Sequence, residues 1–368
     1  MRPGHVLMTA DAVGGVWTYV LDLSQALVAH GAEVTLAVLG PPPDPAQTAA
    51  AENLAGRSLV VAGLPLDWLA EESNALDRAA DSLRSLARER RADLIHLNSP
   101  ALMTSACWET PVVGACHSCL ASWWAAVRGG PMPPDFVWRT RRLAEGYHGC
   151  DALIAPSSTF AQQTAALYGV RPSTVRNGRR RRPTARSGPR ERIVLNAGRL
   201  WDEGKNLSVL DRAASRMRGR VEAVGPLFGP AGQVASPTSH VALPGPMNPV
   251  DLDQRMQAAA IFCSPALYEP FGLGVLEAAQ AGCALVLADI PTFRELWDGA
   301  AVFVDPRDDA ALASTLDNLL EDDERVRQLS ARAARRAGAF SMEATATGTL
   351  AVYAEVLDNR RTAREAAA

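Results

Sequence analysis

Residues 260–290 read AIFCSPALYEPFGLGVLEAAQAGCALVLADI, and they decide the fold. The apolar run 260–263 predicts a buried strand, and the run 284–288 predicts a second one. Between them, a loop at residues 268–272 leads into a predicted helix over residues 273–281. A strand, a helix and a strand in this order form a parallel unit, and parallel sheets bind ligands beyond the carboxyl ends of their strands. The stretch therefore predicts an α/β fold with a ligand crevice at this loop.

Two acids lie in that predicted crevice. Glu269 is on the loop, and Glu277 is about one turn inside an otherwise apolar helix, where a carboxylate is costly unless a polar group meets it. The free amides of Phe271, Gly272 and Leu273 at the helix start form an anion site. Amides for phosphate and acids for hydroxyls predict a nucleotide-sugar site. The alternative is that Glu277 only favours the helix dipole and Glu269 is solvated.

The segment Glu269-Pro-Phe-Gly-Leu-Gly-Val-Leu-Glu277 resembles the E-x7-E motif of retaining glycosyltransferases of the GT-B fold, glycosyltransferase family 4 in particular. The resemblance implies that the first acid holds the hydroxyls of the donor sugar and that the second holds the ribose. It also implies an α/β architecture of two doubly wound Rossmann-like domains facing across a cleft. It extends over nearly the whole chain.

The composition agrees with a two-domain enzyme. The chain has 368 residues, enough for two domains, and 48% of them are apolar. Its 37 basic and 40 acidic residues leave a net charge of −3, so no global charge favours nucleic acid. The apolar run in the first ten residues is too short for a signal peptide or a membrane span. We therefore expect a cytoplasmic protein whose six cysteines are reduced.

The N-terminal region predicts a second parallel unit. A strand at 5–9 leads through a loop at 10–17, which carries Gly14 and Gly15, into a helix at 18–30. The glycines would let backbone amides approach a phosphate. A dinucleotide site is the alternative, but the G-x-G-x-x-G pattern is absent and the next strand does not end in an acid, which excludes nicotinamide cofactors. The resemblance places the two glycines beside the donor phosphates and the acceptor.

Strands are also predicted at 93–97 and 111–115, and the second one delivers Cys116, His117 and Cys119 to its carboxyl end. A C-x-x-C pair can be redox-active or half of a metal site, but no second pair lies at a suitable spacing. The plainest alternative is a histidine paired with backbone. The resemblance implies a third role, in which His117 lies close to the reacting carbon of the donor sugar and supports an oxocarbenium-like transition state.

Two adjacent tryptophans follow this segment. Flat aromatic faces suit sugar rings, so Trp123 or Trp124 is a candidate for lining the acceptor cleft. Core packing is the alternative for both. Further back, the predicted helix 76–91 ends in three arginines, which we interpret as a solvated basic face. The alternative there is peripheral contact with anionic lipid at the inner membrane face.

Two cations follow the predicted strand 192–195. Arg199 lies just beyond the strand, and Lys205 lies six residues on, where it is predicted to open a helix. A departing diphosphate needs such charges because negative charge develops on it as the glycosidic bond breaks. The alternative is two exposed cations in a loop. The family carries an arginine and a lysine in this arrangement, which implies the diphosphate role.

The domain boundaries follow from an arginine-rich segment. Residues 176–192 contain eight arginines with prolines and glycine, which is typical of a solvated linker; aromatic residues, which nucleic-acid binding would need, are missing. We expect a linker at 179–191 between an acceptor-side domain, 1–178, and a nucleotide-sugar domain, 192–341. The resemblance implies that a last helix, about 342–368, returns to complete the first domain.

A possible metal motif is weak. Asp251 and Asp253 form a D-x-D pattern, but they open a predicted helix at 252–259, where N-capping is the better interpretation. We expect no bound metal, and no cofactor other than the nucleotide-sugar co-substrate.

These features together predict a retaining glycosyltransferase. It would move a sugar from a nucleotide diphosphate sugar, UDP- or GDP-linked, to a hydroxyl of a glycan, a lipid-linked sugar or a small metabolite. The resemblance implies that the leaving phosphate takes the proton of the acceptor. Two alternatives stay open: a GT-B-fold epimerase or phosphorylase, and a catalytically silent nucleotide-sugar-binding protein.

Overall fold

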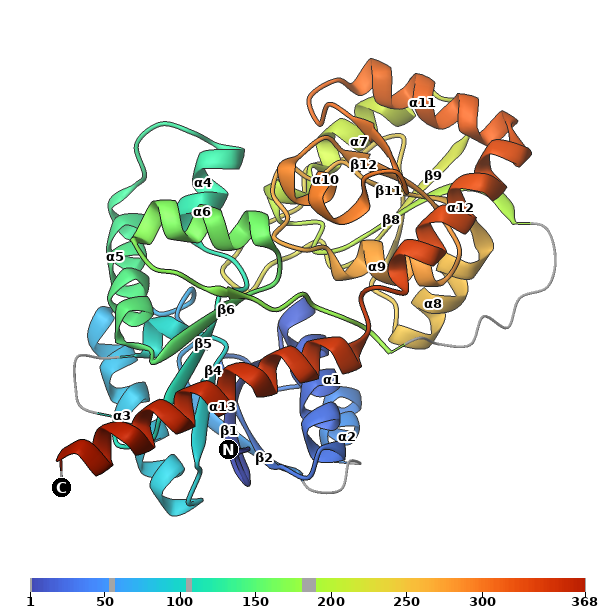
Figure 1. The fold of residues 1–368 in the computed structure, drawn as a ribbon. Coiled ribbons are helices and arrows are strands. Elements are labelled where there is room, and N and C mark those ends of the chain that lie inside the picture. Colours follow the sequence, from blue (N-terminus) through green and yellow to red (C-terminus); the bar gives the residue numbers. More distant parts are fainter. Residues whose placement is uncertain (1, 53–56, 104–107, 181–189, 368) are drawn as a thin grey trace. The chain divides into compact units, whose positions relative to one another are not determined.

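The computed structural model describes residues 2–52, 57–103, 108–180 and 190–367, and it divides into two compact units (Figure 1). The N-terminal unit comprises Met1–Ala125, Gly129–Asn177 and Met342–Ala368. The C-terminal unit comprises Ala126–Arg128 and Gly178–Ser341. The chain thus passes between the units after Asn177 and returns after Ser341.

The N-terminal unit is built on a parallel sheet with the strand order β3-β2-β1-β4-β5-β6-β7. Its central strands are buried on both faces, which is why they read as continuous apolar runs. The strands are β1 (His5–Asp11), β2 (Glu33–Leu39), β3 (Arg57–Leu64), β4 (Leu94–Leu97), β5 (Val112–Ala115), β6 (Ala152–Ala155) and β7 (Ser173–Thr174).

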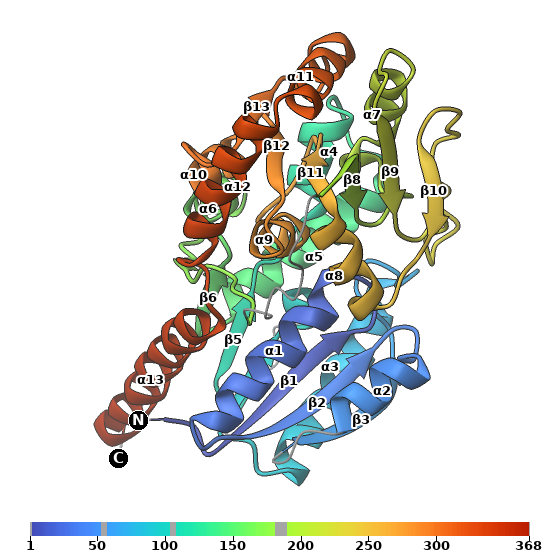
Figure 2. The same cartoon turned by 90° about the vertical axis from the view of Figure 1, so that its right-hand side faces the viewer.

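Helices cover this sheet, and α1 lies across β1 and β2 (Figure 2). The long C-terminal helix α13 packs against α1, and Leu350 and Tyr353 join the same apolar core as Val20 and Leu23. The helices are α1 (Gly15–Ala29), α2 (Pro45–Glu52), α3 (Ser73–Glu89), η1 (Pro100–Leu102), α4 (Leu120–Val127), α5 (Pro134–Gly149), α6 (Ser158–Tyr168) and α13 (Met342–Ala367).

The C-terminal unit has a parallel sheet with the order β10-β9-β8-β11-β12-β13. The strands are β8 (Glu191–Ala197), β9 (Arg220–Val224), β10 (Ala242–Gly245), β11 (Ala259–Ser264), β12 (Ala284–Ala288) and β13 (Val302–Val304). The helices are η2 (Glu203–Lys205), α7 (Leu207–Ala214), α8 (Pro249–Ala258), α9 (Leu273–Gln280), α10 (Pro291–Trp297), α11 (Asp309–Glu321) and α12 (Asp323–Ala337). The stretch that opened the sequence argument forms β11, α9 and β12, which confirms the predicted α/β class.

Both sheets reverse their winding at an equivalent place. The chain runs outward from β1 to β3 and then returns to place β4 on the other side of β1; β8 and β11 have the same relationship in the C-terminal unit. Ligands of such sheets bind outside the carboxyl ends of the strands at the reversal. The loops after β1, β4, β8 and β11 are therefore the places to look for a site.

The starts of two helices were predicted wrongly. Helix α1 begins at Gly15 rather than at residue 18, so Trp17 is buried in the helix instead of lying on a loop. Helix α8 is capped by Asn248, whose side chain accepts hydrogen bonds from the amides of Val250 and Asp251. Asp251 is therefore a first-turn residue and not the cap, because the helix starts three residues earlier than its apolar pattern indicated.

Among the described residues, no helix combines the length and the apolar character that crossing a membrane requires.

Candidate functional site

In the C-terminal unit, the loop between β11 and α9 is shaped by Gly272. This residue has φ of 90°, a conformation that side chains disfavour, and it serves as the N-cap of α9. Phe271 is buried against the ring of Phe340, with ring centroids 5.7 Å apart. The loop is thus anchored by an aromatic residue and turned by a glycine, so that the amides at the start of α9 and the carboxylate of Glu269 belong to one short segment.

Glu269 is joined to Lys205, which lies on the crossover between β8 and β9. Lys205 Nζ lies 2.5 Å from Glu269 Oε2, and both side chains are less than one-fifth exposed. The two loops are also tied by the backbone, since the amide of Leu267 donates to the carbonyl of Gly204 at 2.9 Å. Because β8 and β11 are neighbours, their loops bring together a cation and a carboxylate that are 64 residues apart in sequence.

Lys205 is the only lysine in the chain, whose other basic residues are all arginine. An ammonium group is a compact point charge, whereas guanidinium is planar and larger. The sequence predicted that Lys205 opens a helix, and this prediction is wrong. Lys205 ends η2, and α7 begins at Leu207. Asn206 separates the two helices at φ of 61° and donates to the carbonyls of Pro265 and Pro306.

Arg199 lies on the loop between β8 and η2. Its guanidinium is 3.0 Å from the carboxylate of Asp202 and lies over the ring of Trp201, 5.4 Å from the centroid. Its side chain is about one-third exposed (36%), so the guanidinium retains access to solvent. Arg199 and Lys205 therefore come from one loop, and each is held by a carboxylate of the same unit.

Glu277 has a partner that the sequence analysis missed. Arg179 Nε lies 2.8 Å from Glu277 Oε1, and their side chains are 11% and 27% exposed. The Arg179 amide donates to the carbonyl of Phe340, and Arg179 forms an isolated parallel bridge with Ser341. Little in the sequence indicated this ion pair beyond a charged residue, Arg179, beside Gly178, where the chain passes between the units.

The arginine-rich segment is only partly described. Residues 181–189 lie outside the described residues. Arg190 donates to the carbonyls of Ala259, at 2.8 Å, and Ala281, at 2.5 Å. At Arg179 and Arg190 the expectation of a solvated linker is therefore wrong, because both guanidinium groups are bonded within the C-terminal unit.

In the N-terminal unit, the loop after β1 turns through Gly14. Gly14 has φ of 84°, Asp11 Oδ1 accepts a hydrogen bond from the amide of Val13 at 2.7 Å, and Gly15 is the first residue of α1. Gly14 and Gly15 are both exposed. The turn therefore leaves the amide end of α1 open to a ligand.

His117 follows β5 and is partly exposed. Its Nε2 lies 2.6 Å from Asn98 Oδ1, and the Tyr19 ring packs against it edge-on, with ring centroids 4.7 Å apart. Desolvation by the surrounding protein lowers the pKa of His117 to about 4. The imidazole is therefore neutral at neutral pH. Asn98, the first residue after β4, is a second group that the sequence analysis missed.

The cysteines beside His117 are not joined in a disulfide. Cys116 and Cys119 are both buried, and burial raises the pKa of Cys116 to about 12. A buried thiol with a raised pKa is unreactive, which does not support a redox role. Across the described ranges, no cluster of three or more histidine, cysteine or acidic residues is arranged to hold a metal ion.

The two tryptophans lie on α4. Both are partly exposed, and both pack against Phe136 of α5, with centroids 6.4 Å away for Trp123 and 5.4 Å for Trp124. The Trp124 indole donates to the carbonyl of Gly130 at 3.1 Å. Each tryptophan thus has a packing role and keeps part of its surface accessible.

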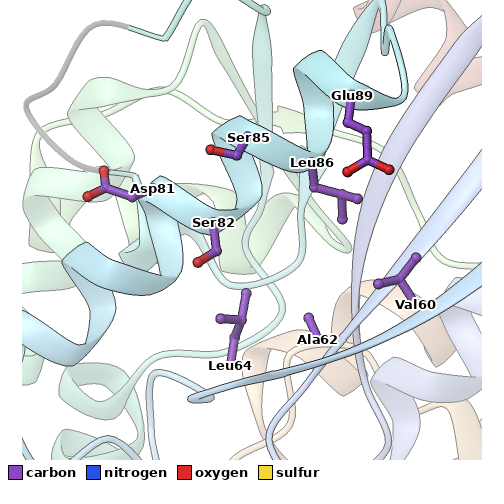
Figure 3. Close-up of a pocket in the computed structure, with 8 residues that line it drawn as sticks. All are labelled: Val60, Ala62, Leu64, Asp81, Ser82, Ser85, Leu86 and Glu89. Carbon is purple, nitrogen blue, oxygen red and sulfur yellow. The ribbon is translucent and has the colours of Figure 1, made fainter.

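A hollow of about 470 Å³ lies elsewhere, between the edge strand β3 and α3 (Figure 3). None of the predicted site residues lines it. Its rim carries Asp81 and Glu89, and Arg84 and Arg90 of the same region pair with these acids. The mixed charge favours the solvated-face interpretation of α3.

Two family models match the chain. One, described as Glycosyltransferase Family 4, matches residues 13–179, and the other, Glycosyl transferases group 1, matches residues 233–336. The chain is 27% identical to a glycogen synthase of Mycobacterium tuberculosis, over 93% of this chain and 91% of that protein. It is 29% identical to a D-inositol 3-phosphate glycosyltransferase of Nocardia farcinica, over 95% and 86%.

Solved structures agree on the fold. A sucrose-phosphate synthase from Thermosynechococcus elongatus superposes with a TM-score of 0.79 at 19% identity, covering 96% of this chain and 99% of the other. HepE from Anabaena, solved with UDP and glucose, gives a TM-score of 0.74 at 16% identity, covering 95% and 99%. These neighbours confirm the predicted GT-B fold. With both family models matched in order along it, the chain belongs to the family 4 (group 1) glycosyltransferases.

Proposed function

We propose that the protein is a retaining glycosyltransferase that takes a sugar from a nucleotide diphosphate sugar, UDP- or GDP-linked. The observation that carries the proposal is the Lys205–Glu269 pair, 2.5 Å apart, at the carboxyl ends of neighbouring strands. It joins a cation suited to a diphosphate with an acid suited to sugar hydroxyls. The family membership and the named activities of the relatives support it.

On this proposal, the C-terminal unit binds the donor. Arg199 and Lys205 stabilise the departing diphosphate, and the amides of Phe271, Gly272 and Leu273 add hydrogen bonds at the start of α9. In the same unit, Glu269 orients the sugar and Glu277 accepts from the ribose hydroxyls. Arg179 holds Glu277 through Oε1 and thereby orients the carboxylate.

The N-terminal unit contributes the groups near the reacting carbon. Gly14 and Gly15 offer amides to the phosphates, and His117 faces the transferred sugar. Trp123 and Trp124 line the acceptor site. The configuration is retained if the acceptor hydroxyl attacks the anomeric carbon from the face that the leaving phosphate departs from. The leaving phosphate then takes the proton of that hydroxyl, so the route needs no protein base. Positive charge for the diphosphate comes from Arg199 and Lys205, so we propose that no metal is required.

The acceptor is a hydroxyl of a glycan, a lipid-linked sugar or a small metabolite. One relative is named a glycogen synthase and another a D-inositol 3-phosphate glycosyltransferase, and these names support testing acceptors of either size. UDP-linked sugars are the first donors to test, since HepE was solved with UDP.

The unique lysine makes a direct test possible. Reductive methylation labels only Lys205 and the chain N-terminus, and mass spectrometry separates the two. The protein is labelled with and without UDP-, GDP- and ADP-glucose, and nucleotide release is measured in parallel. We expect one donor to protect Lys205, and Lys205→Ala and Glu277→Ala to abolish release with that donor.

A surface variant serves as the control. Arg216→Ala removes an exposed cation of the same unit that pairs with Asp309, and it should leave both protection and release unchanged. If no donor protects Lys205, the proposal fails. If a donor protects Lys205 without any release, the protein is a nucleotide-sugar-binding module. Protection with release of a free sugar epimer would indicate the epimerase alternative.

A further inference from the structure

The side chain of Asn98 is fixed by Thr9, a fully buried residue of β1. The backbone N–H of Asn98 donates to Thr9 Oγ1 at 2.8 Å. The side-chain Nδ2 of Asn98 donates to the backbone carbonyl of Thr9 at 2.6 Å. A carbonyl oxygen only accepts hydrogen bonds, so it must face the NH2 group of Asn98. The other half of that amide, Oδ1, therefore points away from Thr9.

Asn98 Oδ1 lies 2.6 Å from His117 Nε2. Since Oδ1 also only accepts, Nε2 must carry a proton. A neutral imidazole has a single N–H, so Nδ1 of His117 then carries the lone pair. Thr9 thus determines, through Asn98, which nitrogen of His117 is the acceptor.

The groups around His117 keep it neutral. Two titratable side chains of neighbouring elements interact with it: the Tyr19 ring of α1 packs on it, and His96 of β4 is close enough for an electrostatic interaction. Burial raises the pKa of Tyr19 and lowers that of His96 to about 3. Neither group is negatively charged at neutral pH, so neither favours the imidazolium form of His117. His96 in turn is held by Tyr353 of α13, with His96 Nδ1 2.7 Å from the phenol oxygen.

We propose that Asn98 is a positioning residue that holds His117 in the Nε2–H tautomer, so that His117 Nδ1 accepts a hydrogen bond from a hydroxyl of the transferred sugar. The assignment of that hydroxyl rests on the function proposed above; the tautomer does not. A neutral acceptor suits this place, because an imidazolium would repel the positive charge that develops on the sugar ring.

The tautomer can be observed without activity. The full-length protein is labelled with 15N-histidine, and two-bond 1H–15N spectra are recorded near neutral pH; His117 is one of six histidines and is assigned with His117→Gln. We expect a protonated Nε2 and an unprotonated Nδ1 in the wild type. Asn98→Ala should give a mixture of tautomers. Asn98→Asp places a carboxylate against Nε2 and should raise the pKa of His117 by at least about one unit.

Kinetics give the second readout. Asn98→Ala should lower kcat at least about tenfold, which corresponds to one misdirected hydrogen bond, while the donor KM changes little. In Asn98→Asp, the acid limb of the kcat profile should move to higher pH together with the His117 titration. The control is Asp93→Ala, which removes two backbone hydrogen bonds at the opposite end of β4 and should leave the His117 spectrum unchanged.

The outcomes are separable. A wild-type spectrum with the proton on Nδ1, or an Asn98→Ala spectrum with an unchanged single tautomer, overturns the proposal. If the spectra show the expected tautomers but the protein transfers no sugar, the proposed function is wrong and the positioning role of Asn98 still holds. Expected tautomers with unaltered kcat in Asn98→Ala would overturn the link to the sugar hydroxyl.

Discussion

Arg179 Nε lies 2.8 Å from Glu277 Oε1, so the acid that the family motif assigns to the donor ribose is already engaged by an arginine. Arg179 follows Gly178, the first residue after the chain enters the C-terminal unit, and its amide bonds the carbonyl of Phe340, next to the residue where the chain leaves. Glu277 is therefore tied, through Arg179, to the segments at which the chain enters and leaves the C-terminal unit.

Arg179→Ala is predicted to weaken nucleotide binding. Without the guanidinium, the Glu277 carboxylate loses its fixed orientation, and we expect the Kd for the nucleotide to rise about three- to tenfold, consistent with roughly one hydrogen bond. Since the pair is partly exposed, the free energy of unfolding should fall by no more than about 1 kcal/mol. Calorimetric titration measures the Kd, and urea unfolding measures the free energy of unfolding.

The control variant is Arg190→Ala, which removes hydrogen bonds to backbone carbonyls and should affect stability rather than affinity. Equal or tighter binding by Arg179→Ala would contradict the prediction.

Lys205→Arg is predicted to be nearly as damaging as Lys205→Ala. The 2.5 Å contact with Glu269 fits an ammonium group, and the planar guanidinium cannot occupy the same place without displacing the acid. We expect kcat/KM to fall by about 10² or more, the range typical of groups that stabilise developing charge. Initial rates at low donor concentration give this ratio. An arginine variant with wild-type kcat/KM would show that charge alone is needed.

The buried histidine His96 predicts acid sensitivity. Burial lowers its pKa in the folded protein to about 3, from about 6.5 in the unfolded chain. Because the unfolded chain takes up the proton first, the stabilising difference is fully present above about pH 6.5 and is lost as the pH falls toward 3. His117, with a pKa of about 4, acts in the same direction. Each group contributes a slope of up to about 1.4 kcal/mol per pH unit.

Urea unfolding between neutral pH and about pH 4.5 tests this expectation. His96→Gln should reduce the slope, although it also removes the bond to Tyr353 and lowers stability at neutral pH. His148→Gln removes an exposed histidine and should leave the slope as in the wild type. An unchanged slope in His96→Gln would rule out the assignment.

Arg91→Gly is predicted to stabilise the protein. Arg91 directly follows Arg90, the C-cap of α3, and is exposed. Its φ of 53° is a left-handed conformation that costs a residue with a side chain roughly 1–2 kcal/mol. We expect the free energy of unfolding to rise by about 0.5–1 kcal/mol, since glycine also gains entropy in the unfolded chain. The neighbour Arg90 has φ of −81°, so Arg90→Gly should destabilise. The same sign for both variants in urea unfolding would contradict the argument.

Local chemistry predicted much of the fold. The strand–helix–strand order of residues 259–288 appears as expected, because apolar runs and glycine stops act over a few residues. The start of α1 was missed because the apolar periodicity begins later than the helix. There the positive φ of Gly14 lets the helix begin directly after the turn. The strand β3, Arg57–Leu64, was not predicted, because the alanine-rich sequence that precedes it favours a helix.

The sequence by itself determined the elements, the α/β class and the residue types of the site, since these depend on neighbours along the chain. Tertiary structure decided the partners. Lys205 meets Glu269 because β8 lies beside β11, and Asn98 meets His117 because β4 lies beside β5. Which strands become neighbours is settled by packing of the whole sheet. The Lys205–Glu269 ion pair and the tautomer of His117 follow from that packing, because both depend on atoms that are distant in sequence and within 3 Å in space.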